Sequence, residues 1–163
     1  MPSIPENTDR AAVDEFWLAC SKALPHLNLP TKKFALRCIG TTQEMNSTIL
    51  GLIASGQKVG TFPLPRQLER MGEPLPKPGD FTIQLTLGGK PKLLVQTTSA
   101  EIIPFRAITA EHTAIDGPTV RALDVWRKVH IPYYTNILAA FGETFTEDIS
   151  TCVERFTCLY VAP

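Results

Sequence analysis

The sequence predicts an α+β fold in which a small antiparallel or mixed β-barrel is surrounded by α-helices. Helical and strand-like segments are interspersed along the chain, without the regular alternation of a parallel sheet. One strand is especially clear, because the segment FTIQLTL at 81–87 alternates in hydrophobicity and Gly88-Gly89 follows as a tight turn. The chain has 163 residues, 44% of them hydrophobic, which suits one domain with a real core.

The N-terminal part of the chain is predicted to hold an arm and a helix. Residues 1–8 carry two prolines and polar side chains, which are typical of a loose arm. Asp9 or Thr8 can cap a helix that runs to about Leu24, because apolar residues recur there at helical spacing and prolines follow. The predicted division of the chain is an N-terminal arm and helix, residues 1–32, and a main domain, residues 33–163.

A strand, a second helix and an irregular segment are predicted next. Residues 33–39 form a short strand. Thr41 or Thr42 then caps a helix that stops at Gly56. Five prolines between residues 62 and 80 exclude a regular sheet there. We expect this segment to be an ordered excursion with a short helical turn, which either closes over a cleft or forms a rigid rim.

The rest of the chain is predicted to contain two long strands with helices between them. The first strand spans residues 93–103, and the closing strand spans residues 152–161. Two helical segments lie between these strands, at 108–115 and 119–130. Pro132 is expected to interrupt the second segment, because proline lacks the N–H that an inner helical turn needs.

Charge and hydropathy narrow the classes of function. Lys and Arg together number 16, as do Asp and Glu, so a broad basic face for long duplex nucleic acid is not expected. No apolar run reaches the roughly 18 residues that span a bilayer. The N-terminus also lacks the pattern of a signal peptide. We therefore expect a soluble protein with no membrane partner, located in the cytoplasm, with the nucleus as an open alternative.

The cysteines do not form the pattern of a metal site. None of them pairs as CxxC, which speaks against zinc. All lie in apolar contexts, which are typical of buried, reduced thiols inside a cell. We therefore expect neither a metal nor a cofactor. The four cysteines are Cys20, Cys38, Cys152 and Cys158.

Four groups of residues, in order along the chain, carry a resemblance to a known family. They are Ser55-Gly56-Gln57-Lys58 followed by Thr61; Glu73 to Asp80 leading into a strand; Val95 to Thr98, Ile103 to Phe105, His112, Asp116-Gly117, Trp126-Arg127 and His130; and Phe141-Gly142, Phe145, Asp148 and Glu154 to Phe156. This ordered set is similar to the ASCH domains, which belong to the PUA-like β-barrels. The resemblance covers about residues 33–161 and implies a small, partly open barrel with helices around a cleft.

The resemblance also implies a link to RNA. Some ASCH domains are proposed RNA-binding modules, some are reported as ribonucleases, and some small ones hydrolyse the acyl amide of N4-acetylcytidine. In those amidohydrolases the proposed catalytic set is a Lys, a Thr three residues later and a downstream carboxylate. The matching positions are Lys58, Thr61 and Asp116. Asp116 stands where Glu is usual in the family, and the neutral Gln96 stands where many longer relatives carry Glu.

Amide hydrolysis gives these three residues distinct roles. The reaction needs a nucleophile, proton transfer and donors for the developing oxyanion. A desolvated Lys58 amine takes the proton of Thr61 or of a water, and Asp116 hands a proton to the leaving amine. Thr61 is either the nucleophile or a hydrogen-bonding partner of the substrate. Residues three apart on a regular strand face opposite ways, so Lys58 and Thr61 converge only if the backbone bends, which Gly60 permits.

The same residue types also have structural interpretations, which the sequence leaves open. A lysine that follows a helix commonly complements the helix dipole, and threonine favours strands. Asp116, two residues before Pro118, suits the cap of a helix. Glu154 and Arg155 are adjacent on a strand and face opposite ways, and one of them is expected to form a buried pair with another element.

Six further residues are predicted to contact a ligand. The arginines among them suit a phosphate. The tyrosine belongs to an aromatic group, with Trp126 and His130, that either stacks on a base or packs in the core. The histidine lies four residues before Asp116, and lining the cleft or a structural hydrogen bond is expected for it rather than metal binding. These predicted substrate-binding residues are Arg37, Arg66, Gln96, His112, Arg127 and Tyr134.

Three functions follow as hypotheses. The first is a hydrolase that cleaves an acyl amide or a phosphodiester in a modified nucleoside or RNA. The second is a non-catalytic module that binds RNA or a nucleotide in the same cleft. In both cases the partner is RNA, a nucleoside or a nucleotide, and the neutral charge favours a small ligand. The third is a protein-interaction adaptor that uses the proline-rich segment 62–80.

Overall fold

The sheet is the centre of the fold. The computed structural model describes residues 4–163, and its five strands form one mixed sheet in the order β1-β3-β4-β5-β2. β1 pairs with β3 in parallel, and the other neighbouring strands pair antiparallel. The strands are β1 (Ala35–Arg37), β2 (Gly60–Thr61), β3 (Phe81–Leu85), β4 (Pro91–Pro104) and β5 (Ser150–Val161).

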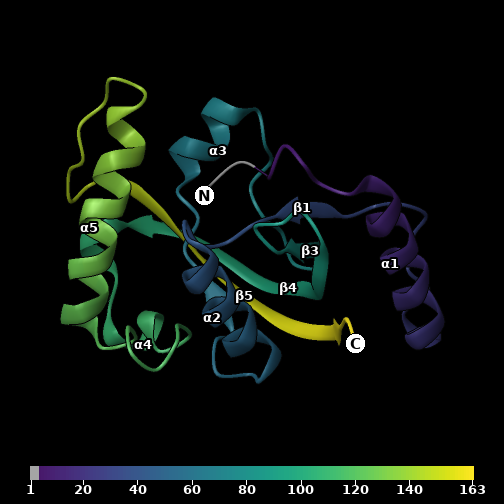
Figure 1. The fold of residues 1–163 in the computed structure, drawn as a ribbon. Helices are drawn as coiled ribbons and strands as arrows, with labels where there is room; N and C mark the ends of the chain where they lie inside the picture. Colours follow the sequence, from purple (N-terminus) through teal and green to yellow (C-terminus); the bar gives the residue numbers. More distant parts are fainter. Residues whose placement is uncertain (1–3) are drawn as a thin grey trace.

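Helices pack around both ends of this sheet. Figure 1 shows α1 at one end and α5 at the other, with α2 and α3 between them. Short 3-10 turns at Pro25–Leu27 and Phe105–Ala107 complete the regular elements. None of the helices in the described part of the chain is long and apolar enough to cross a membrane. The α-helices are α1 (Arg10–Ala23), α2 (Gln43–Ala54), α3 (Pro65–Met71), α4 (Ala110–Thr113) and α5 (Leu123–Ala139).

The α+β class is confirmed, but the five strands do not close into the predicted barrel. The sheet is open, with β1 and β2 as its two edges. β1 holds three residues and β2 holds two, so neither edge offers a long ladder to close on the other. The sheet still has a polar connection across one face, because Arg37 on β1 reaches Glu154 on β5 past the two strands between them.

Three apolar clusters hold the helices on the sheet. Ile83 and Leu94 lie on one face and pack against α1. The opposite face presents Leu93 and Val95 to α2. At the far end of β4 and β5, Val153 joins a third cluster with α5 and the segment that follows β2. Because successive strand residues point to opposite faces, this alternation fixes the register of the sheet.

The predicted helix caps are confirmed at the starts of α1 and α2 and at the end of α2. The backbone N–H of Ala12 donates to the carboxylate of Asp9 over 2.9 Å at the start of α1. Thr42 caps α2 in the same way. Gly56 follows α2 with a positive φ of 74°, a conformation that costs glycine little. The thiols are also as predicted, since all four cysteines are unpaired and three are buried.

Two local predictions are wrong. α5 continues through Pro132 to Ala139, because Tyr134 and Leu138 beyond the proline are anchored in the core. Residues 4–8 are not a loose arm either. The side chain of Asn7 donates to the carbonyl of Gly88, so this segment packs on the turn between β3 and β4. The prediction for residues 1–3 lies outside the described residues.

Candidate functional site

Lys58 is positioned by the turn that ends α2. The backbone N–H groups of Gln57 and Lys58 both donate to the carbonyl of Leu52, over 2.9 and 3.0 Å. This tight closure sends the chain directly from α2 into β2. Val59 then donates to the carbonyl of Ile115 over 2.9 Å, which holds the segment after α4 beside the segment before β2. Lys58 and Asp116 therefore lie next to each other.

The structure joins Lys58 and Asp116 in a buried ion pair. Lys58 Nζ donates to Asp116 Oδ1 over 2.8 Å. Their side chains are only 7% and 8% exposed. The same carboxylate oxygen accepts a hydrogen bond from the backbone N–H of Gly117 over 2.8 Å. Removal from water strengthens the attraction between the two charges and makes either charge costly without the other.

His130 on α5 is a neutral neighbour of this pair. Its ring stacks on Trp126 with centroids 4.0 Å apart, and its Nδ1 lies 2.9 Å from the carbonyl oxygen of Trp126. Burial lowers the pKa of His130 to about 4, and the nearby Lys58 charge acts in the same direction, although the Trp126 carbonyl and Asp116 oppose the shift. The imidazole is therefore uncharged at neutral pH. The sequence pattern indicated His130 as part of the family resemblance and of an aromatic group, but not as a neighbour of Lys58 and Asp116.

Thr61 lies apart from the pair. It sits opposite Glu154 in the register of β2 and β5, so the two side chains share a face of the sheet. Among the described residues, no hydrogen bond joins the Thr61 side chain to Lys58 or Asp116. Gly60 separates them, and a Cβ there would lie 2.4 Å from both the Glu154 carbonyl and a methyl of Ile115. Only glycine fits between these two chain segments.

Glu154 is the centre of a second buried ion pair. Its side chain is 1% exposed and accepts from Arg37 Nη1 over 2.8 Å. Its other oxygen accepts from the Thr97 hydroxyl over 2.9 Å. The expected buried pair on this strand is thus formed by Glu154. The sequence signal was the adjacent Glu154 and Arg155 on one strand, whereas Thr97 appeared only within the family pattern, with no role assigned to it.

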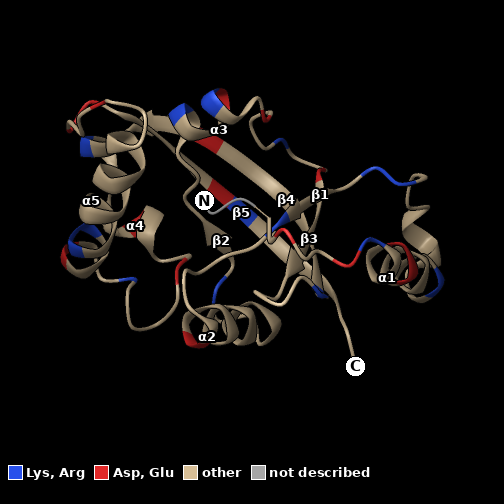
Figure 2. Cartoon of the chain, turned by 45° about the horizontal axis from the view of Figure 1, so that its top comes forward, with Lys and Arg blue, Asp and Glu red and all other residues tan. Residues whose placement is uncertain are grey.

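The other predicted phosphate-binding arginines are already paired. Arg66 makes hydrogen bonds to both oxygens of Glu143, at 2.6–3.0 Å, and another to Glu69. These bonds lower the pKa of Glu143 to about 2 and raise that of Arg66. Arg127 pairs with Glu147 and lies 4.9 Å over the ring of Phe105. Figure 2 shows that α1, α3 and α5 each carry both signs of charge.

The remaining predicted binding residues have local partners. His112 closes the first turn of α4, because its Nδ1 accepts from the backbone N–H of Thr109 over 2.9 Å. Gln96 donates to the carbonyl of Gly79 over 3.4 Å. Tyr134 is fully buried and donates to the carbonyl of Phe62 over 2.6 Å. The prediction that Tyr134 contacts a ligand is corrected, because its ring belongs to the core and cannot stack on a base.

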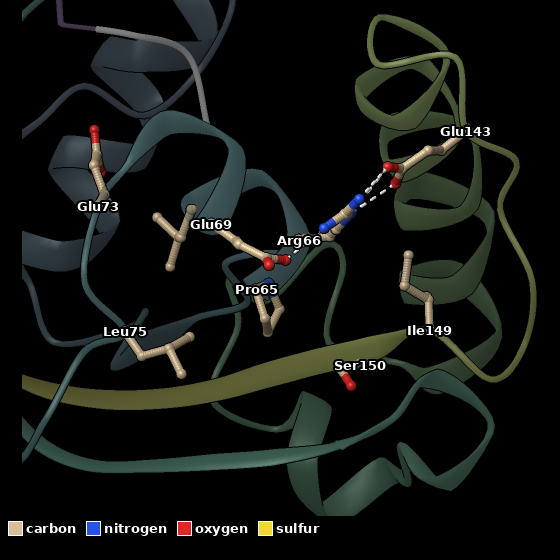
Figure 3. Close-up of a pocket in the computed structure, with 9 residues that line it drawn as sticks. Pro65, Arg66, Glu69, Glu73, Leu75, Glu143, Ile149 and Ser150 are labelled. Atoms are coloured by element: carbon tan, nitrogen blue, oxygen red, sulfur yellow. Dashed lines mark hydrogen bonds and ion pairs between the residues drawn. The ribbon is translucent and has the colours of Figure 1, made fainter.

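A pocket of about 600 Å³ lies between α3, the segment after it and the start of β5 (Figure 3). Of the predicted site residues only Arg66 lines it, and three glutamates accompany that one arginine. An anionic ligand is disfavoured there. No group of three or more potential ligands among residues 4–163 is arranged to hold a metal ion. The lining residues are Pro65, Arg66, Leu68, Glu69, Glu73, Leu75, Glu143, Ile149 and Ser150.

Comparisons with known proteins agree with this architecture. The chain is similar to the ASCH domain from Lactobacillus crispatus JV V101, with 18% identity, a TM-score of 0.82, and coverage of 97% of this chain and 99% of that one. It is also similar to protein EF3133 from Enterococcus faecalis V583, described by the family model DUF984, with 25% identity and a TM-score of 0.78. That match covers 91% of this chain and 88% of the other. No curated protein matches the sequence significantly.

The family itself is shown by the sequence. The family model described as "ASCH domain" matches residues 37–160, which include both buried ion pairs and every predicted site residue. The open sheet and its surrounding helices are those of the solved ASCH domain from L. crispatus. This protein therefore belongs to the ASCH domain family.

Proposed function

We propose that this protein hydrolyses the acyl amide of a modified nucleoside. The observation that carries the proposal is the buried ion pair between Lys58 and Asp116, whose atoms lie 2.8 Å apart. A buried, closely coupled acid and base in the position of the family's proposed catalytic set is the arrangement that amide hydrolysis requires. ASCH domains are generally associated with RNA, which supports RNA as the source of the nucleoside.

The pair can carry the protons of the reaction. In the proposed step, the Asp116 carboxylate takes a proton from water, and the water oxygen bonds to the acyl carbon. Lys58 stabilises the oxyanion and gives a proton to the leaving nitrogen as the carbon–nitrogen bond breaks. The products are a carboxylic acid and a free amine. Proton transfer from Asp116 to Lys58 over their 2.8 Å hydrogen bond then restores both groups.

The charges outside the pair support a small ligand over a phosphate backbone. The three predicted phosphate-binding arginines are Arg37, Arg66 and Arg127, and each is already paired with a glutamate. A guanidinium that is neutralised by a carboxylate adds little attraction for another anion. The net charge of the chain is also zero. A single nucleoside therefore fits the described surface better than a long RNA strand.

The test is an assay for products by mass, with acylated cytidine, free cytidine and short single-stranded RNAs as substrates. Replacing Lys58 alone would leave Asp116 buried without a partner, so the decisive variant is Lys58→Met combined with Asp116→Leu. We expect this variant to fold and to lose at least about 100-fold in turnover, the contribution typical of positioned acid–base groups. Lys32→Met, which removes a lysine from an exposed ion pair with Asp14, is the matched control.

Two further results would distinguish water from Thr61 as the nucleophile and test the role of the Lys58–Asp116 pair. Thr61→Val keeps the shape of the side chain and removes its hydroxyl. Since water is the proposed nucleophile, we expect this variant to retain measurable turnover, whereas complete loss would make Thr61 the nucleophile. Unchanged turnover in the Lys58/Asp116 double variant would refute the proposal.

A second function, nucleoside binding without catalysis, is favoured by one observation. Lys58 and Asp116 are almost fully covered, and neither lines the pocket beside α3. A closed pair of this kind can fix a binding loop without contacting a reacting atom. Thermal stabilisation of the wild type by cytidine, with no product from any acylated substrate, would support this function.

A further inference from the structure

Gln84 in the middle of β3 is the least satisfied side chain in the sheet. It is 1% exposed, and neither its amide nitrogen nor its amide oxygen has a hydrogen-bond partner among residues 4–163. Among the described residues, the only other buried side-chain polar atom in this situation is the indole nitrogen of Trp126. A buried amide without partners is destabilising, so its presence in a strand calls for a specific explanation.

The register places Gln84 beside the second buried ion pair. Arg37 is its partner on β1, and Leu93 is its partner on β4, so all three side chains share a face. Arg37 then reaches Glu154 on β5, and Thr97 on β4 donates to the same glutamate. The contact between Arg37 and Glu154 therefore spans the face of the sheet on which the Gln84 amide lies.

The unused hydrogen-bonding groups in this region are of a defined kind. Both oxygens of Glu154 are occupied, one by Arg37 and one by Thr97. A guanidinium has five N–H donors, and within the part of the chain that the structure describes Arg37 uses one of them, in its bond to Glu154. What remains is a set of donors on Arg37 and the paired donor and acceptor of the Gln84 amide. The Arg37 charge is compensated, so this set suits a neutral partner rather than an anion.

We propose that Gln84 and the free N–H groups of Arg37 form a hydrogen-bonding subsite for the base of a nucleoside. A nucleobase edge combines ring-nitrogen or carbonyl acceptors with amine donors, which matches a primary amide beside a guanidinium. Arg37 lies on the edge strand and is 10% exposed, so it is the side of the subsite that touches solvent. This inference rests on the proposed function for the identity of the ligand, but it concerns binding and not turnover.

The test uses Gln84→Met, which keeps the length of the side chain and removes the amide. The probes are cytidine and ribose, titrated calorimetrically against the full chain, and the melting temperature is recorded for each variant. We expect Gln84→Met to melt at a higher temperature than the wild type, because it removes an unsatisfied buried amide. We also expect it to bind cytidine at least about 10-fold more weakly, the loss typical of an unmade hydrogen bond in a polar site. Gln43→Met, at the exposed start of α2, is the matched control and keeps both values.

The outcomes separate this inference from the proposed function. Cytidine affinity in Gln84→Met within twofold of the wild type would overturn the subsite, even if the wild type hydrolyses acylated cytidine. Equal binding of ribose and cytidine by the wild type would overturn it as well, as would no binding of either. Weaker cytidine binding by Gln84→Met would support the subsite even if no substrate is ever hydrolysed.

Discussion

The two buried ion pairs differ in what holds them. Glu154 stands on β5, which pairs with β4 on one side and β2 on the other, and Arg37 stands on the edge strand β1, which pairs with β3. Lys58 and Asp116 stand in connecting segments. These segments are linked by the hydrogen bond from Val59 to Ile115 and by Arg121, which donates to the carbonyls of Asp116 and Gln57. Connecting segments can open at lower cost than a ladder can. The two ion pairs are therefore buried to a similar extent but are not held with equal rigidity.

This difference suggests a division of labour between the two pairs. A pair within the sheet is suited to a fixed surface against which a ligand is aligned. A pair between segments is suited to chemistry, because a small opening admits water and substrate to charges that are otherwise shielded.

Breaking the pair within the sheet should be the most costly change. Arg37→Met leaves Glu154 buried without its cation, and we expect a loss of about 3–5 kcal/mol in the free energy of unfolding. Lys58→Met should cost less, about 1–3 kcal/mol, because Asp116 keeps its bond from Gly117 and lies in a segment that can admit water. Urea unfolding measures both values. Equal losses would contradict the difference in rigidity, and Arg37→Met combined with Glu154→Leu should recover most of the loss.

The neutral histidine beside the Lys58–Asp116 pair should make stability depend on pH. The folded pKa of His130 is about 4, below its usual 6.5, so the unfolded chain binds more protons between these values. Stability contributed by the neutral ring is complete above pH 6.5 and is lost as pH falls towards 4. The expected change is about 3 kcal/mol, from 1.36 kcal/mol for each pKa unit.

His130→Gln should remove this contribution. Thermal unfolding of the variant and the wild type between pH 4 and 7 would measure the difference in slope. His112→Gln is the control, since that histidine caps the short helix α4 outside the cluster around Trp126. Parallel pH profiles for wild type and His130→Gln would mean that the ring is not held neutral.

Gly60 lies between the two ion pairs, so a substitution there tests how closely the chain segments that carry them are packed. Gly60→Ala would push a methyl into the Glu154 carbonyl on one side and into the Ile115 side chain on the other. We expect a loss of about 1–3 kcal/mol in stability, the usual cost of overpacking. Gly51→Ala is the matched control, because a Cβ there meets nothing within 4 Å and lies in α2. Gly51→Ala should be neutral or stabilising, and an equal loss in both variants would contradict the close packing at Gly60.

The smallest effect is expected for an ion pair on the surface. Lys32 and Asp14 lie 3.2 Å apart, with side chains 65% and 48% exposed. Lys32→Met should change the free energy of unfolding by less than about 1 kcal/mol, because water screens an exposed pair. The measurement is the same urea titration. If Lys32→Met lowered the free energy of unfolding as much as Lys58→Met does, burial would not determine how much an ion pair contributes to stability.

Local features of the fold followed from local sequence. Asp9 marks the start of α1, and Gly88-Gly89 marks the turn between two strands, because the chemistry that makes them operates over a few residues. Pro132 misled the prediction because tertiary packing of Tyr134 and Leu138 overrides a local preference. The sequence also did not show that the partly open barrel would be an open sheet, since the lengths of the edge strands depend on partners that are distant in sequence.

The site was predictable only in part for the same reason. Lys58 and Asp116 were found through their place in an ordered family pattern, and they do lie together. Their catalytic role stays a prediction. Thr97 was missed, because its role as a donor to Glu154 depends on a register that no short motif encodes. Gln84 was missed because only the folded structure shows that its buried amide has no hydrogen-bond partner among the described residues.

The strand order has a consequence for the making of the protein. β5 is the last strand in the sequence, but it lies inside the sheet between β4 and β2. The ion-pair partner of Arg37 is Glu154, which lies 117 residues further along the chain. On the ribosome, β2 and the buried arginine thus stay without their partners until β5 has been synthesised. Contacts of such long range fold slowly and leave strand edges open to other chains in the meantime.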